Sequence, residues 1–148
     1  MNVRADDDGY VVEAEVPSVE DYRRLRVAAG LSPKSQEAAV RGLPNSCFAV
    51  TVRHQGRAVG MGRIVGDGGC FFQIVDIAVE PAHQRRGLGR RIMAALHDWL
   101  SAHAAEGAYV SLIADGDARH LYAQFGFVET APASVGMARV VRRQARAG

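Results

Sequence analysis

Short runs in which apolar and polar residues alternate fill the first half of the chain, a pattern typical of strands that bury one face. The first run spans residues 10–16 and ends at Pro17, which cannot donate to a sheet ladder. Two further runs, 46–53 and 57–65, are joined by a turn of hairpin length, and the run 70–79 follows a glycine-rich turn. The pattern predicts a first strand followed by three consecutive antiparallel strands.

A helical spacing of apolar residues comes after these strands. Leu88, Ile92, Leu96 and Leu100 recur every four residues and share one face, which predicts a long amphipathic helix that begins near Gly87. Three shorter helices are predicted at residues 19–29, 36–41 and 118–124.

The second half of the chain adds three strand-like runs, at residues 108–113, 125–129 and 135–141. The long helix separates the run 70–79 from the run 108–113, so these two strands are expected to be parallel neighbours in a βαβ unit. The sequence therefore predicts an α+β (mixed α/β) fold with a mixed, mostly antiparallel sheet of six to seven strands.

Composition supports one globular domain over residues 1–148, with a core from about 9 to 141 and a basic tail at 142–148. The formal net charge of +2 is too small to indicate nucleic acid as the main partner, and the basic tail is interpreted as solvated. A homodimer is left open.

Metal, redox and membrane functions find no support in the sequence. The two cysteines, Cys47 and Cys70, form no Cys-x-x-Cys pair and have no clustered histidines nearby, so no metal is expected. No apolar run approaches membrane-spanning length, and the acidic start lacks the form of a secretory signal. The chain is therefore predicted to be cytoplasmic, with no membrane partner.

The segment from Ile74 to Arg91 carries the strongest chemical signal, because an apolar strand runs through a cationic loop into a helix. Gly87 and Gly89 lie where the loop becomes the helix, and there backbone N–H groups without helical acceptors can converge on an anion. Arg85, Arg86, Arg90 and Arg91 flank this turn, and guanidinium groups pair with phosphate oxygens in two-point fashion. The segment predicts a pyrophosphate site.

Asp76 is the one carboxylate in this otherwise apolar strand. A buried carboxylate without a partner would cost several kcal/mol, so Asp76 is expected to pair with a cation or to line a wet cavity. The strand runs directly into the anion loop, and for this reason we favour the cavity.

Two motifs resemble those of the GNAT superfamily of acyltransferases, which move an acyl group from coenzyme A to an amine. Residues 84–89 (Gln-Arg-Arg-Gly-Leu-Gly) match the family's Gln/Arg-x-x-Gly-x-Gly/Ala loop, and residues 121–127 (Leu-Tyr-Ala-Gln-Phe-Gly-Phe) match its Leu-Tyr-x-x-x-Gly-Phe segment. The order of elements from Tyr10 onwards agrees as well. The resemblance implies helices on both faces of the sheet and a V-shaped splay between the fourth and fifth strands.

The resemblance also implies where acetyl-CoA, the acyl donor, would bind. Its pyrophosphate would lie on the loop amides and its pantetheine arm beside the fourth strand. The residues implied are Ile77, Ala78, Val79, Gln84, Arg85, Arg86, Gly87, Leu88, Gly89, Arg90, Asp115 and Tyr122.

Three residues are implied in catalysis. Tyr122 would be the general acid that protonates the departing thiolate, and the Val79 N–H would polarise the thioester carbonyl. Gln73 occupies the position where some family members carry Glu or His as the general base, and it cannot titrate. Asp76 is the nearest carboxylate and is expected to bind the substrate cation or orient a water.

The predicted function is acetyl transfer from acetyl-CoA to a primary amine of a small molecule, by direct attack in a ternary complex. A protein or peptide N-acetyltransferase is the alternative within the same chemistry, and a non-catalytic CoA-binding or nucleic-acid-associated module is the alternative of another class. A dinucleotide-binding fold fits worse, because Ile92 stands where its third glycine would be.

Overall fold

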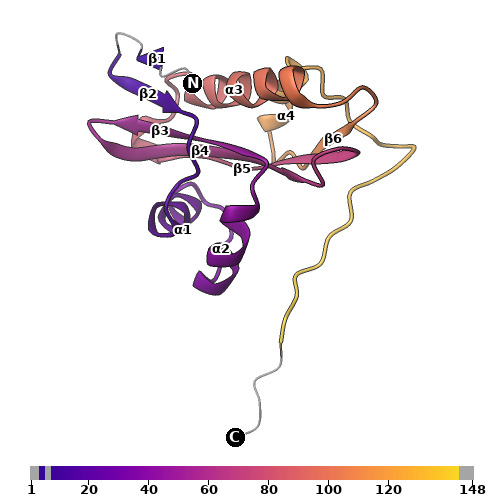
Figure 1. Cartoon of the computed structure of the whole chain (residues 1–148), viewed down its shortest axis with the longest axis horizontal. Coiled ribbons are helices and arrows are strands. Elements are labelled where there is room, and N and C mark those ends of the chain that lie inside the picture. Colours follow the sequence, from indigo (N-terminus) through magenta and orange to yellow (C-terminus); the bar gives the residue numbers. More distant parts are fainter. Residues whose placement is uncertain (1–3, 6–7, 144–148) are drawn as a thin grey trace, which may run out of the picture.

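The computed structural model describes residues 4–5 and 8–143, which adopt a mixed α+β fold. Two layers of helices cover a central sheet: α1 and α2 lie on one face, and α3 and α4 lie on the other (Figure 1). The elements are β1 (Arg4–Ala5), β2 (Tyr10–Glu13), α1 (Val19–Ala28), α2 (Gln36–Gly42), β3 (Phe48–His54), β4 (Arg57–Gly66), β5 (Phe71–Val79), α3 (Leu88–His103), β6 (Tyr109–Leu112) and α4 (Ala118–Ala123).

The strands of the described chain lie in sequence order, β1-β2-β3-β4-β5-β6, with only the β5–β6 pair parallel. Five of the seven predicted strands are therefore present, and the two-residue β1, which the sequence did not predict, completes the six.

The two remaining strand predictions, residues 125–129 and 135–141, are wrong. After α4 the chain makes a turn in which Gly126 has φ 89°, and the Phe127 N–H donates to the Tyr122 carbonyl. Val135 and Met137 are exposed, and the segment runs away from the body of the domain without joining the sheet (Figure 1). Apolar alternation alone does not make a strand, because a strand also needs a partner edge. Of the predicted basic tail, residues 144–148 lie outside the described part.

Two apolar clusters hold the layers together. On one face, α3 buries Leu88, Ile92 and Leu96 against the sheet, as the helical spacing predicted, together with Met93, whereas Leu100 is partly buried. Burial of each such side chain contributes about 1.5–3 kcal/mol. Gly62 of β4 permits this close approach, since a Cβ there would lie 2.5 Å from Ile92 Cγ2.

The smaller cluster, on the other face, joins α1 and α2 to β4 and β5. Tyr22, Leu25 and Met61 are buried in it together with Ala78. Ser18 is the N-cap of α1, because its hydroxyl accepts the Asp21 N–H at 3.1 Å. This cluster brings α1 over β5 at the point where the candidate site begins.

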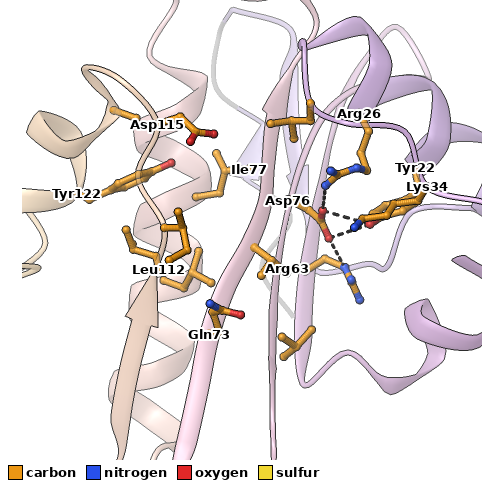
Figure 2. A pocket seen from close by; sticks show the side chains of 16 residues that line it. Tyr22, Arg26, Lys34, Arg63, Gln73, Asp76, Ile77, Leu112, Asp115 and Tyr122 are labelled. Atoms are coloured by element: carbon orange, nitrogen blue, oxygen red, sulfur yellow. Dashed lines mark hydrogen bonds and ion pairs between the residues drawn. The ribbon is translucent and has the colours of Figure 1, made fainter. Parts of the chain in front are cut away.

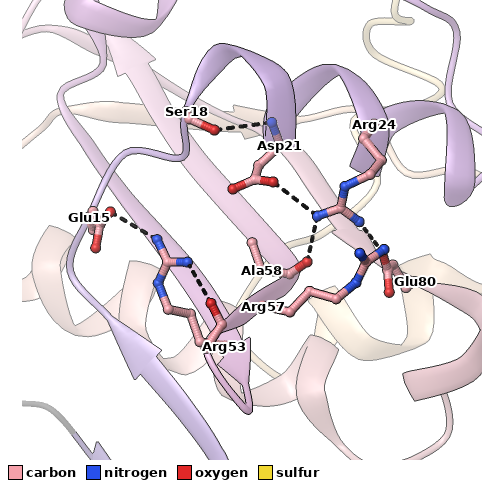
Figure 3. A network of polar contacts seen from close by, with 9 residues as sticks. Glu15, Ser18, Asp21, Arg24, Arg53, Arg57, Ala58 and Glu80 are labelled. Carbon is pink, nitrogen blue, oxygen red and sulfur yellow. Dashed lines mark hydrogen bonds and ion pairs between the residues drawn. The ribbon is translucent and has the colours of Figure 1, made fainter.

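A charged network fastens α1 to the ends of β4 and β5 (Figure 3). Arg24 donates to the Ala58 carbonyl at 2.8 Å and to Asp21 at 3.1 Å, and it also pairs with Glu80. The buried Glu80 carboxylate also accepts a hydrogen bond from the guanidinium of Arg57, with Nη2 2.8 Å from Oε1. Since Glu80 directly follows β5, the network fixes the point from which the anion loop departs.

A bulge in β5 changes which face its side chains occupy. Met61 pairs with Ala78 and Arg63 with Val75, so two residues of β5, Asp76 and Ile77, lie opposite Gly62 alone. Within the bulge, Asp76 has the left-handed conformation, with φ 61°, which aspartate tolerates better than most residues. The bulge therefore turns the Asp76 side chain towards α1.

The two parallel strands separate beyond this point. Pairing of β5 with β6 ends at Ile74 and Leu112, and residues 75–79 of β5 pair only with β4 within the described chain. The opening agrees with the expected splay between the fourth and fifth predicted strands. No helix of residues 4–5 and 8–143 is long and apolar enough to cross a bilayer.

Candidate active site

The turn into α3 has the backbone geometry of an anion site. Gly87 is the N-cap with φ 76°, and Arg85 has φ 62°, so two left-handed residues fold the loop tightly. The first helical hydrogen bond runs from the Arg91 N–H to the Gly87 carbonyl at 3.1 Å. The amides of residues 88–90 precede it and have no acceptor within the helix. They carry the positive end of the helix dipole.

A cavity of about 290 Å³ opens beside these amides and reaches the free side of β5. It brings together nine of the twelve residues expected to hold coenzyme A. These nine are Ile77, Ala78, Val79, Gln84, Arg85, Gly87, Leu88, Gly89 and Tyr122.

The remaining three cofactor predictions lie nearby but outside this cavity. Arg86 and Arg90 are exposed on the loop and the first turn of α3, where their charge can still act on an anion. Asp115 lines a second, adjacent cavity. Arg91 was expected to flank the anion turn, but it points to β2, where it donates to the Tyr10 carbonyl at 3.2 Å and to Asp8 at 3.3 Å.

Gln84 fastens the loop to the end of β5. Its Nε2 donates to the Val79 carbonyl at 2.9 Å, a contact that the loop motif did not reveal. Gln84 thereby sets the distance between the anion turn and the free edge of β5.

The direction of the Val79 amide follows from the pairing of β5. The Glu80 N–H donates to the Val59 carbonyl of β4 at 2.8 Å, and successive amides of an extended strand point to opposite sides. The Val79 N–H is therefore directed away from β4, into the opening between β5 and β6. This is the direction expected of a donor to a thioester carbonyl.

Tyr122 lies where the two cavities meet, because it lines both of them together with Ile77 and Ala118. Burial raises the pKa of its phenol above the ordinary value of 10, and the nearby Asp115 carboxylate raises the pKa further. Tyr122 is therefore protonated at neutral pH, as a general acid must be.

The second cavity, of about 480 Å³, lies between β5, β6 and α1 (Figure 2). Asp115 and Tyr122 are on one side of it, and Tyr22, Arg26 and Arg63 are on the other. Gln73, at the position where the sequence resemblance implied a general base, also lines this cavity.

Asp76 both lines this cavity and pairs with two cations. Its side chain is only 4% exposed, and it accepts from Arg63 Nε at 2.8 Å, from Arg26 Nη1, and from the Tyr22 hydroxyl at 3.1 Å. The sequence favours a wet cavity over a cation partner, whereas in the structure Asp76 lines a cavity and also pairs with two arginines. The carboxylate is thus already committed to protein donors.

Sequence reasoning did not find Arg26, Lys34 and Arg63, which contribute the cationic side of the cavity, or the Tyr22 phenol that lines it with them. They are distant from Asp76 along the chain, so no local motif indicates that they meet it. The one available hint was the carboxylate itself, because a buried Asp76 requires nearby donors. Among residues 4–5 and 8–143, no group of three His, Cys, Asp or Glu side chains could hold a metal ion.

Comparison with known proteins agrees with these features. A family model described as an acetyltransferase (GNAT) domain matches residues 44–129. A structure from meticillin-resistant Staphylococcus aureus, described as a protein of unknown function and probable acetyltransferase, is 47% identical with a TM-score of 0.85. That match covers 89% of this chain and 99% of that chain. No curated protein matches the sequence.

Two more distant structures share the fold. Glucosamine-6-phosphate N-acetyltransferase from Arabidopsis thaliana is 14% identical with a TM-score of 0.66, over 90% of this chain and 99% of that chain. The ribosomal-protein-S18-alanine N-acetyltransferase from Escherichia coli is 21% identical with a TM-score of 0.68, over 82% and 79%. The family match over more than half of the chain and the 47% identity to the staphylococcal protein show that this chain belongs to the GNAT family of acetyltransferases.

Proposed function

We propose that the protein transfers an acetyl group from acetyl-CoA to a primary amine of a small molecule, by direct attack in a ternary complex. The observation that carries the proposal is the position of Tyr122, where the cavity beside the anion turn meets the cavity between β5, β6 and α1. A donor thioester in one cavity and an amine in the other would meet at this phenol.

The donor set fits coenzyme A. Converging amides at the start of α3 and the arginines 85, 86 and 90 suit a pyrophosphate, and the free edge of β5 suits an amide-containing arm that pairs with it as an added strand. These residues would bind and orient acetyl-CoA.

The transfer balances without an enzyme-bound acyl group. The neutral amine nitrogen attacks the thioester carbonyl carbon, a C–N bond forms, and the C–S bond breaks with its electron pair leaving on sulfur. The Val79 N–H would stabilise the charge that develops on the carbonyl oxygen, and Tyr122 would protonate the sulfur and recover its proton from solvent.

The cysteines support direct attack. Neither Cys47 nor Cys70 lines either cavity, and the Cys47 Sγ lies 3.6 Å from the Gly66 carbonyl, away from the splay. A covalent acyl-cysteine intermediate would need a thiol beside the thioester.

The proton lost by the amine would go to water. Gln73 cannot accept it, and two guanidinium groups and a phenol already occupy the oxygens of Asp76. We therefore revise the role expected for Asp76: it would orient Arg26 and Arg63 and would not bind the amine itself.

The size of the second cavity, hereafter the acceptor cavity, supports a small molecule as the acceptor. Its volume of about 480 Å³ lies in the usual range for small-molecule sites, about 300–1,000 Å³. Related folds act on both a sugar phosphate and a ribosomal protein, so the fold does not decide between acceptor classes.

The test is thiol release from acetyl-CoA in the presence of a panel of small primary amines and of peptides with free amines. Release with small amines and a mass gain of one acetyl group on the amine would support the proposal. Release with peptides alone would indicate a protein acceptor. Salt-dependent DNA retention without any release would favour a non-catalytic module.

Gly89→Leu is expected to abolish saturable CoA binding in calorimetry, because its side chain would fill the cavity beside Leu121. The fold should persist: Gly89 needs no positive φ, and a Cβ there would lie 3.5 Å from Leu121 Cδ2, an ordinary contact. Gly42→Leu is the matched control, since a Cβ at Gly42 meets nothing within 4 Å. Unchanged CoA affinity in Gly89→Leu would contradict the cavity assignment.

A further inference from the structure

The cationic side of the acceptor cavity carries more positive than negative charge. Arg26 and Arg63, whose side chains are both 10% exposed, share the single carboxylate of Asp76. Guanidinium groups stay protonated in proteins, so this cluster holds two positive charges and one negative charge away from bulk water. A buried charge without a counterion is costly, and a bound anion would remove that cost.

Tyr22 does not supply the missing negative charge. Burial raises the pKa of its phenol above the ordinary value of 10, and the Asp76 carboxylate beside it raises the pKa further. The hydroxyl donates to Asp76 at 3.1 Å and therefore remains neutral. Its ring lies under the Arg63 guanidinium, 5.4 Å from the centroid, and holds that group in place.

Donors remain unused beside the cavity. Within the described residues, Arg63 donates through Nε to Asp76 and through Nη1 to Ser46 at 2.8 Å, and its Nη2 has no hydrogen-bond partner. Lys34, exposed and lining the same cavity, has no ion pair in that part of the chain. Arg26 is fixed by Ser32, whose carbonyl accepts from Nε at 2.7 Å.

From this arrangement we infer that the acceptor amine also carries an anionic oxygen group, a carboxylate or a phosphate, which binds to Arg63 and Lys34, with Arg26 adding its positive charge nearby. The inference rests on the proposed function for the amine end and extends it to the other end of the molecule. The anion would lie on the α1 side of the cavity, and the amine would reach the Tyr122 side (Figure 2).

The opposite side of the cavity has the complementary charge. Asp115 lines it close enough to Tyr122 to raise the pKa of that phenol. An incoming ammonium group is attracted to this carboxylate and repelled by the arginine side. The cavity thus orients a molecule with an amine at one end and an anion at the other, and it disfavours an acceptor with two amines.

The first test compares matched amines that differ only in the anion: 4-aminobutyrate with butylamine, and 2-aminoethyl phosphate with ethanolamine. The anionic member of at least one pair is expected to have about a tenfold to a hundredfold higher kcat/KM, the effect of a hydrogen-bonded charge. The better pair distinguishes carboxylate from phosphate. Equal use of both members in both pairs would overturn the inference and leave the proposed function intact.

The second test uses variants of the cationic side. Arg63→Gln should fold, because Arg26 and Asp76 then form a neutral pair, and Lys34→Ala removes an exposed side chain. Each is expected to raise the KM of the anionic amine about tenfold with kcat unchanged, since the anion binds equally in the ground and transition states. Arg41→Gln, on α2 outside the cavity, removes the same charge and should change neither constant.

A binding measurement separates the inference from the proposed function. With saturating coenzyme A to fill the anion turn, inorganic phosphate or acetate is expected to raise the melting temperature of the wild-type protein and not that of Arg63→Gln. If no amine is acetylated but this difference is found, the anion site stands and the proposed reaction fails. If amines are acetylated and neither anion stabilises the wild-type protein, the anion site is refuted.

Discussion

Replacement of Tyr122 by phenylalanine is expected to lower kcat by about 10²–10⁴-fold, the usual contribution of a positioned general acid. The affinity for acetyl-CoA should stay within about twofold, because the aromatic ring at position 122, which packs against the apolar cluster between α3 and the sheet, is retained. Steady-state thiol release gives kcat, and calorimetry with coenzyme A gives the affinity. Equal turnover in the two proteins would refute the assignment of the acid.

Tyr109→Phe is the matched control, since it removes a phenol from β6 that lines neither cavity. The pH profile adds a second readout. The pKa of Tyr122 is raised, so the acid form is lost only as pH rises through a value above 10. Activity should increase with pH as the amine deprotonates and should show no Tyr122-dependent decline below about pH 10.

The cofactor side of the site could be predicted from the sequence because its determinants are local. Gly87 and Gly89 lie within three residues of each other and of the start of α3, so loop, turn and helix dipole are all written in one short segment. The spacing of apolar residues predicted the adjacent β5 and α3 for the same reason, because each of these elements buries apolar side chains that recur at regular intervals along its own sequence.

The acceptor side could not be predicted, because it depends on contacts between distant segments. Asp76 meets Tyr22 and Arg26 only after α1 packs over β5, and the bulge at Asp76 and Ile77 reverses the face that simple alternation assigns to Asp76. A period of two places Asp76 with Ile74 on the α3 side. Because of the one extra residue in β5, the Asp76 carboxylate pairs with Arg26 and Arg63 and is not left free to bind a ligand.

The C-terminal run from Val135 shows the opposite limit. Its apolar alternation is real, but the run forms no ladder: within residues 4–5 and 8–143, β6 pairs only with β5, its outer edge stays unpaired, and the run is exposed. Strand propensity measures fit to a pleated, half-buried surface, and this run is not half-buried.

Replacement of Asp76 by asparagine is expected to lower the free energy of unfolding by about 3–5 kcal/mol, the cost of removing one partner from a buried ion pair. The substitution leaves Arg26 and Arg63 without a counterion in a site where each is 10% exposed. Asparagine accepts the left-handed backbone at this position as readily as aspartate, so the change isolates the charge. Urea denaturation monitored by Trp99 fluorescence measures the effect.

Glu37→Gln makes the same carboxylate-to-amide change in the exposed pair with Arg41 and should alter the free energy of unfolding by no more than about 1 kcal/mol. The double variant Asp76→Asn with Arg63→Gln removes one of the two guanidinium groups that lack a counterion, so it is expected to be less destabilised than the sum of the single variants. Additive losses would show that Asp76 and Arg63 do not interact energetically. An Asp76→Asn protein as stable as the wild type would mean that water already hydrates and screens the two guanidinium groups. The electrostatic basis of the anion site would then be lost.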